Sequence, residues 1–254
     1  MTIAHHRPAP NRLDIPAPRR PPAAETVEPR DAVVPVPVWQ TSIRLLHWLL
    51  VATIVVLTIT GFYIGTPVLA PQPGSIPMQL ARAVHLFTGF LFTAVLLARF
   101  VLLFTGNRWA RWRQFLPVEP ERRRLLVPSL RYYLFIDKEP PPVVGHNPLA
   151  GLTYLVLFAM FVAQAVTGIA LEAVEERGGW AWTLTGWVFD IASVPTVRFF
   201  HHLVMWLTIG FVVHHVYSAV LVDREERSGE ISSIISGWKS VPRSRVEDDV
   251  RHGR

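Results

Sequence analysis

The stretch from Phe199 to Val222 places four histidines inside a segment that is long and apolar enough to cross a membrane. It contains no Asp, Glu, Lys or Arg, and a helix needs about 20 apolar residues to span a bilayer core. The histidines occur as two pairs, His201-His202 and His214-His215. Because ionisable side chains inside a span are unfavourable, their presence indicates a functional site.

Helix geometry separates these four histidines. In an α-helix, His201 and His215 fall within about 40° of each other around the axis and roughly 21 Å apart along it. The other pairings across the span are about 120 to 140° apart, so we expect His202 and His214 at interfaces or behind the ligands. Two imidazoles at two depths suit two stacked haems, because imidazole is a common haem ligand. Each iron then requires a second histidine from another helix.

The composition excludes several classes of protein. Half of the 254 residues are hydrophobic and the mean hydropathy is +0.30, which indicates an integral membrane protein. The absence of cysteine excludes disulfides, iron–sulfur clusters and covalently attached haem. The net charge of +6 comes from arginines that flank apolar segments, so it predicts membrane topology and no nucleic-acid partner.

The predicted fold is an all-α membrane protein, a four-transmembrane-helix bundle enclosing two b-type haems. The apolar segments are about 45–65, 84–106, 149–171 and 199–222, with a short interfacial helix expected around 125–136. Residues 1–38 are rich in Pro and Arg and have no signal-peptide pattern, so we expect a disordered cytoplasmic tail. Residues 39–241 form the di-haem membrane domain, and 242–254 a flexible cytoplasmic tail.

Charge distribution orients the spans. Basic residues concentrate before the first span and between the second and third, so both termini are expected on the cytoplasmic side of the inner (cytoplasmic) membrane. His47 then lies at the inner end of span one, and His85 at the outer end of span two. Matching depths pairs His85 with His201 around an outer haem and His47 with His215 around an inner haem. The alternative is four unrelated interfacial histidines, which does not account for the match at both depths.

Four further residues are candidates for contacts with cofactors. Arg44 and Arg99 lie near the inner membrane face, where they can pair with haem propionates or simply extend to lipid headgroups. His146 and Asn147 precede span three. Asn147 suits a helix N-cap before Pro148, and the two side chains also suit a polar quinone pocket beside the inner haem. The residues alone leave both pairs of alternatives open.

Several motifs together resemble a known family. They are RLLHWLLVATIVVLTITGFYIGTP, AVHLFTGFLF, RYYLF, GHNPLAG, HHLVMW, HHVYSAV and ISSIISGWKS, in this order over about residues 38 to 241. The chain resembles the cytochrome b subunit of membrane-bound nickel–iron uptake hydrogenases. The Pro/Arg-rich tail, His214 and the acidic EAVEERGGW stretch depart from the family pattern.

The resemblance implies two b haems on the four histidines derived above and a quinone site near His146 and Asn147. It implies that the hydrogenase small and large subunits are partners, with the small subunit and its anchor helix on the outer face. Electrons would pass from the hydrogenase to membrane quinone in a respiratory chain. The hydrogen-splitting metals would lie elsewhere, because their thiolate ligands are absent from this chain.

Two other functions remain open at this point. The histidine pattern is shared with gamma subunits of formate dehydrogenase or thiosulfate reductase type complexes. A membrane anchor or transporter without haem is the third candidate, although transporters usually carry more spans and internal repeats. This chain has only a short internal sequence echo of that kind, a similarity between TITGF at 58–62 and AVTGI at 165–169.

Overall fold

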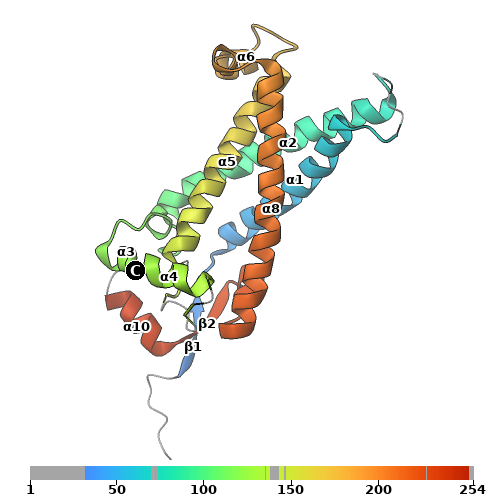
Figure 1. Cartoon of the computed structure of the whole chain (residues 1–254). Helices are drawn as coiled ribbons and strands as arrows, with labels where there is room; N and C mark the ends of the chain where they lie inside the picture. Colours follow the sequence, from blue (N-terminus) through green and yellow to red (C-terminus); the bar gives the residue numbers. More distant parts are fainter. Residues whose placement is uncertain are drawn as a thin grey trace, which may run out of the picture.

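The computed structural model describes residues 32–251 apart from 70–71, 73, 135, 138–142, 146 and 227. Four long helices dominate it: α1 (Thr41–Gly65), α2 (Ile76–Thr105), α5 (Pro148–Ala173) and α8 (Val194–Glu226) (Figure 1). All four are long and apolar enough to cross a membrane. The prediction of a four-helix membrane bundle is therefore confirmed, and the chain is a multi-pass membrane protein.

The long helices form two antiparallel pairs. α1 packs mainly on α2, and α5 on α8, with the α1–α2 pair tilted away from the α5–α8 pair (Figure 1). Where the pairs meet, Phe92 and Leu96 of α2 bury against Leu157 and Phe161 of α5. Most other large apolar side chains of the helices stay exposed, as expected for helices that face lipid.

The second helix starts earlier than the sequence pattern predicts. α2 begins at Ile76 rather than near residue 84, so His85 lies in its third turn and not at its end. Ser75 holds the N-cap position with extended backbone, and Pro77 occupies the first turn, where its missing N–H is no loss. These local start signals lie within the segment that we expected to be a loop.

A two-stranded sheet joins the two ends of the described chain. β1 (Val33–Pro37) pairs antiparallel with β2 (Trp238–Pro242), with Val33 opposite Pro242. The prediction of a disordered tail over residues 1–38 is wrong for this strand; residues 1–31 lie outside the described residues. Proline has no N–H to donate. In a two-stranded sheet each strand has one unpaired edge, so the alternating prolines of β1 can face that edge without loss of a ladder hydrogen bond. The helix α10 (Arg243–Arg251) follows β2, in the segment expected to be a flexible tail.

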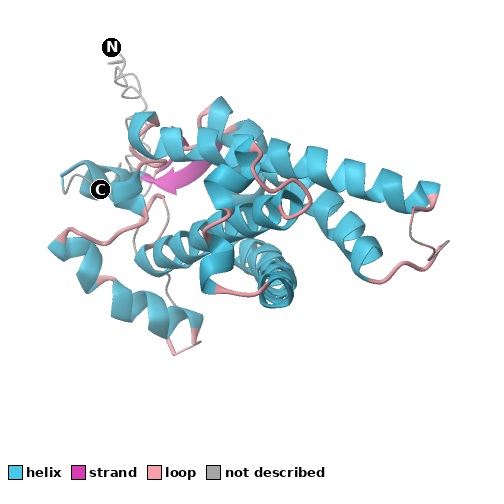
Figure 2. Ribbon diagram, turned by 90° about the horizontal axis from the view of Figure 1, so that it is seen from above, coloured by secondary structure: helices cyan, strands magenta, loops and turns pink. Residues whose placement is uncertain are grey.

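The sheet is tied to the start of α1 and to α9 (Glu230–Ser236). Trp39 donates its indole N–H to Ser233 Oγ at 3.1 Å, and Asn107 donates to the Val38 carbonyl at 2.8 Å. Val38, Trp109, Val144 and Val241 belong to the buried cluster beneath. We call this region the sheet end; both ends of the described chain lie there (Figure 2).

Short helices complete the two ends of the bundle. At the sheet end these are η1 (Trp112–Gln114), α3 (Pro120–Arg124) and α4 (Leu126–Tyr133), and α4 matches the short helix expected around 125–136. At the opposite end, α6 (Trp180–Thr185) and α7 (Val188–Ile191) lie over the start of α8 (Figure 1). We call this second region the α6 end.

Gly237 offers a test of the contact between the sheet end and α1. Its φ is +92°, and a Cβ there would lie 2.8 Å from the Trp39 carbonyl oxygen. We expect Gly237→Ala to lower the free energy of unfolding by about 1–3 kcal/mol, because the backbone must shift as well as adopt a strained conformation. Thermal unfolding of the purified protein in detergent measures the effect.

Gly74→Ala is the matched control for this variant. Gly74 has a similar φ of +80°, and nothing lies within 4 Å of its Cβ position. It therefore reports the conformational cost without the collision. Equal destabilisation by the two variants would show that the close approach to Trp39 is unimportant.

Candidate functional site

Four histidines from three helices come together in two pairs. The ring centroids of His47 on α1 and His215 on α8 are 6.5 Å apart, and those of His85 on α2 and His201 on α8 are also 6.5 Å apart. We call these the sheet-end pair and the α6-end pair. The structure thus brings together the histidines that helix periodicity and depth had paired, and all four are half-buried.

The spacing within each pair fits an iron atom. An iron bound about 2 Å from one nitrogen of each imidazole, the usual metal–imidazole distance, separates the ring centroids by about 6 Å. Over the residues that the structure describes, no three His, Cys, Asp or Glu side chains gather as they would for a bare metal ion. Each pair could therefore hold an iron only if another group, such as a macrocycle, supplied the remaining ligands.

The α6-end pair is held by side chains of the neighbouring helices. Thr60 Oγ1 lies 2.8 Å from His85 Nδ1, and Thr167 Oγ1 lies 2.9 Å from His201 Nδ1. Gln164 Nε2 lies 3.2 Å from the other nitrogen of His201, Nε2. The rings are therefore oriented by hydrogen bonds from α1 and α5, helices that contribute no histidine to this pair.

The sheet-end pair has a different environment. Phe211 stacks on the His215 ring with the planes 9° apart, and the Tyr154 hydroxyl lies 3.4 Å from His215 Nδ1. His47 Nδ1 is buried and has no hydrogen-bond partner among the described residues. This pair is thus positioned mainly by aromatic packing.

An apolar layer separates the two pairs. Phe92 and Phe161 pack edge to face, with centroids 5.3 Å apart, and Leu96 and Leu157 belong to the same buried cluster. Such a layer excludes water and lowers the local dielectric constant. The arrangement suits two redox groups that exchange electrons without exchanging protons with solvent.

His202 and His214 lie outside both pairs, as their positions on the helix faces predict. His202 Nδ1 is 2.8 Å from the Arg198 carbonyl oxygen, within its own helix. The His202 ring lies beside that of its neighbour His201, with centroids 6.3 Å apart, so it borders the α6-end pair. His214 is exposed, with its Nε2 3.5 Å from Ser218 Oγ.

The two arginines differ in their surroundings. Arg44 donates to the Ile235 carbonyl and to Thr41 Oγ1, so it helps to hold α9 against α1. Arg99 lies over the rings of Phe115 and Phe158, at 5.3 and 5.5 Å, and its buried Nη1 has no hydrogen-bond partner within the described part of the chain. Arg44 has a buried Nε without a partner in the same part of the chain, but its other two nitrogens are already bonded, so Arg99 is the better placed to receive an anionic group.

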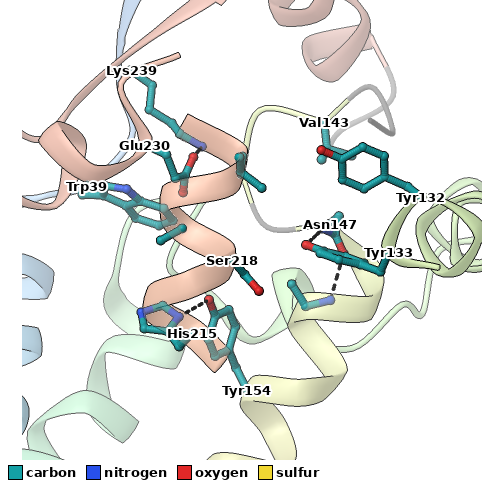
Figure 3. A pocket seen from close by; sticks show the side chains of 14 residues that line it. Trp39, Tyr132, Tyr133, Val143, Asn147, Tyr154, His215, Ser218, Glu230 and Lys239 are labelled. Carbon is teal, nitrogen blue, oxygen red and sulfur yellow. Dashed lines mark hydrogen bonds and ion pairs between the residues drawn. The ribbon is translucent and has the colours of Figure 1, made fainter. Parts of the chain in front are cut away.

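A cavity of about 110 Å³ opens beside His215 at the sheet end (Figure 3). Its volume is on the order of one six-membered ring, since a cavity of about 150 Å³ binds benzene. The side chains of Tyr133, Tyr154 and Asn147 face it from α4 and α5, and Lys239 and Glu230 form an ion pair at its other side. Polar groups thus converge next to one imidazole of the sheet-end pair.

Asn147 has the structural role that its sequence context predicts. Its Oδ1 accepts from the Ala150 N–H at 2.8 Å as the N-cap of α5, and Pro148 opens the helix. Its Nδ2 also donates to the Tyr133 hydroxyl at 2.9 Å, at the cavity wall. His146 lies outside the described residues, so its proposed place in a quinone pocket stays a prediction.

Several lining residues could not be identified from the sequence. Trp39, Glu230 and Lys239 reach the cavity only because β1, α9 and β2 fold together beneath the helices. Tyr154 lies within an apolar span and its hydroxyl points to His215. A hydroxyl group inside an apolar span was the one sequence feature that could have identified Tyr154 as a lining residue.

Comparison with known proteins identifies the family of the chain. The family model of prokaryotic cytochrome b561 matches residues 38–237. The probable Ni/Fe-hydrogenase B-type cytochrome subunit of Bradyrhizobium diazoefficiens is 37% identical over 79% of this chain and 84% of its own length. Those of Azotobacter vinelandii and Escherichia coli K12 are 37% and 30% identical, over 83% and 87% of this chain and 90% and 97% of their own lengths.

A membrane bundle of four helices with two pairs of facing histidines is the architecture of a membrane cytochrome b. The chain belongs to the prokaryotic cytochrome b561 family, among the B-type cytochrome subunits that it resembles in sequence. Membership of a cytochrome b family implies b-type haem.

The two roles of Asn147 can be separated by substitution. Asn147→Ala removes the cap and the bond to Tyr133, and we expect a loss of about 1 kcal/mol of stability. Asn147→Asp keeps the capping oxygen and should unfold at nearly the wild-type temperature in detergent. If Asp destabilised as much as Ala, the bond to Tyr133 and not the cap would be the stabilising contact.

Proposed function

We propose that this chain is the membrane cytochrome subunit of a nickel–iron hydrogenase and passes electrons from it to membrane quinone. The observation that carries the proposal is the assembly of two imidazole pairs, each with centroids 6.5 Å apart, on opposite sides of an apolar layer. The relatives are named as subunits of Ni/Fe hydrogenases, which supports a hydrogenase as the partner.

Two haems b would be held by this chain. His85 and His201 are the axial ligands proposed at the α6 end, and His47 and His215 those at the sheet end. When bound, each haem supplies a one-electron ferric/ferrous couple. Arg99, with its buried and unpaired Nη1, is proposed to neutralise a propionate near the sheet-end pair. Arg44, already bonded to the Ile235 carbonyl, is the weaker candidate for this role.

The sheet end is proposed to face the cytoplasm. Arginines gather in and around α3 at this end, and such residues favour the cytoplasmic side of the inner membrane. The α6 end then faces outward, where the hydrogenase small subunit and its anchor helix would dock. Trp180, Leu184, Trp187 and Ile191 expose their apolar side chains there, as an interface with a protein or with lipid requires.

The cavity beside His215 is proposed as the quinone site. Hydrogen oxidised by the partner releases two protons and two electrons, and a quinone that takes up two electrons and two protons becomes a quinol. Tyr133, Asn147 and Ser218 present polar groups to a bound carbonyl at the cavity wall. The Lys239–Glu230 pair lies between the cavity and the proposed cytoplasmic side, where protons would be taken up.

A gamma subunit of a formate dehydrogenase or thiosulfate reductase type complex would use the same histidines. The relatives, which are named as Ni/Fe-hydrogenase subunits, favour the hydrogenase. The molecular test is purification of the native complex: a nickel-containing large subunit supports the proposal, and a molybdenum enzyme in its place refutes it.

The ligand assignment predicts haem content. We expect two haems per wild-type chain and one in each of His47→Ala, His85→Ala, His201→Ala and His215→Ala, because a haem that loses one axial imidazole is bound much more weakly. His202→Ala and His214→Ala are the matched controls and should retain two. The pyridine haemochromogen assay gives the ratio of haem to protein. Loss of a haem in His202→Ala together with full occupancy in His201→Ala would reverse the assignment.

The quinone site predicts the effect of filling the cavity. Ala219 lines the cavity from α8, and Ala219→Leu should lower hydrogen-driven reduction of a short-chain quinone at least tenfold, because the larger side chain takes the space of the quinone ring. Haem content and hydrogen-driven haem reduction should be unchanged. Ala163→Leu, an exposed position on α5, is the control. A wild-type rate of quinone reduction in Ala219→Leu would place the quinone elsewhere.

A further inference from the structure

A Thr-Gly step lies beside each imidazole of the α6-end pair. Thr60-Gly61 on α1 faces His85, and Thr167-Gly168 on α5 faces His201. These steps are the centres of the short sequence echo between 58–62 and 165–169. The echo therefore marks two equivalent contacts, made by the two helices that give this pair no ligand.

The hydroxyl group of each threonine has its proton committed to its own helix. Thr60 Oγ1 lies 2.8 Å from the Val56 carbonyl oxygen, and Thr167 Oγ1 lies 2.6 Å from that of Ala163. A carbonyl oxygen only accepts, and a hydroxyl has one proton to donate. Both contacts of each hydroxyl are satisfied together when it donates to the carbonyl and accepts from the imidazole Nδ1–H.

This hydrogen-bond pattern decides the tautomer of the two rings. A neutral imidazole with its proton on Nδ1 has its free lone pair on Nε2. The amide nitrogen of Gln164 lies 3.2 Å from His201 Nε2 and can donate to that lone pair, a bond that iron binding at Nε2 would replace. Both threonines thus leave Nε2 of their partner histidine as the nitrogen proposed to bind iron.

The glycines allow the rings to lie close to the helices. A Cβ at position 61 would be 3.4 Å from His85 Cε1, and one at position 168 would be 3.2 Å from His201 Cε1. The first is ordinary van der Waals contact, whereas the second would push the His201 ring away by a few tenths of an ångström. Each threonine hydroxyl therefore contacts the same imidazole ring that packs against the following glycine.

The sheet-end pair has weaker contacts of this kind. His47 Nδ1 has no hydrogen-bond partner among the described residues, and the Tyr154 hydroxyl lies 3.4 Å from His215 Nδ1. An acceptor on the far N–H makes a metal-bound imidazole more basic, and a more basic ligand stabilises the ferric state. The two short threonine contacts therefore act more strongly on the α6-end pair than the single long contact acts on the sheet-end pair.

We infer that Thr60 and Thr167 are positioning residues for the α6-end ligand pair: they fix the Nδ1–H tautomer and lower the reduction potential at this site relative to the sheet-end site. This inference rests on the proposed function. It adds a driving force for electrons to move from the α6 end to the sheet end, since electrons pass from the lower to the higher potential.

Redox titration of the purified protein tests the inference. Thr60→Val and Thr167→Val keep the side-chain shape and remove the accepting oxygen. Each should raise the same haem midpoint potential, by about a tenfold change in the ferric/ferrous balance, or about 59 mV for one electron. The haem that shifts should be the one that is lost in His85→Ala. Thr60→Ser and Thr167→Ser should restore the wild-type potential, because the oxygen returns.

Thr208→Val is the matched control. Thr208 is buried in α8 and donates to the Val204 carbonyl at 2.8 Å, and it makes no hydrogen bond to a histidine among the described residues. Shifts no larger than that of Thr208→Val, or shifts in different haems for the two variants, would overturn the inference. Wild-type protein without two haems would instead refute the proposed function, so the two failures are distinguishable.

Discussion

The structure depends on pairing imidazoles inside an apolar bundle. A histidine between membrane helices has two ring nitrogens to satisfy and few polar groups within reach. In this chain the α6-end rings use Nδ1 for a threonine and turn the rest of the ring toward another imidazole on a different helix. Each pair links α8 to the α1–α2 hairpin, so the groups proposed to bind cofactor also hold the two helix pairs in register.

The long helices and the histidine pairs follow from regular periodicity. Four apolar segments fix the number of spans, and 3.6 residues per turn places His201 and His215 on one face of α8. The distribution of basic residues then orients the spans, and this orientation predicts the depths of His47 and His85 in the membrane. These inferences need only local geometry and the thickness of a bilayer, which explains why the structure brings the expected residues together.

The sheet end could not be predicted by such reasoning. β1 and β2 pair across nearly the whole described chain, and two of the five residues of β1 are prolines, which argue against a strand when read alone. The lining of the cavity could not be predicted for the same reason, because Trp39 and Lys239 reach the cavity through that pairing. The start of α2 was missed for a different reason, since Ser75 and Pro77 are capping signals outside the apolar window.

The two ends of the bundle therefore perform different physical tasks. At the α6 end, hydroxyls bonded to helix carbonyls leave the imidazoles few alternatives in tautomer or orientation. At the sheet end, aromatic packing leaves room for a cavity, and an ion pair and several hydroxyls line it. Electron entry requires a fixed geometry and no protons, whereas quinone reduction requires space, hydrogen bonds and access to protons. The proposed direction of electron flow, from the α6 end to the sheet end, matches this difference in the groups around the two imidazole pairs.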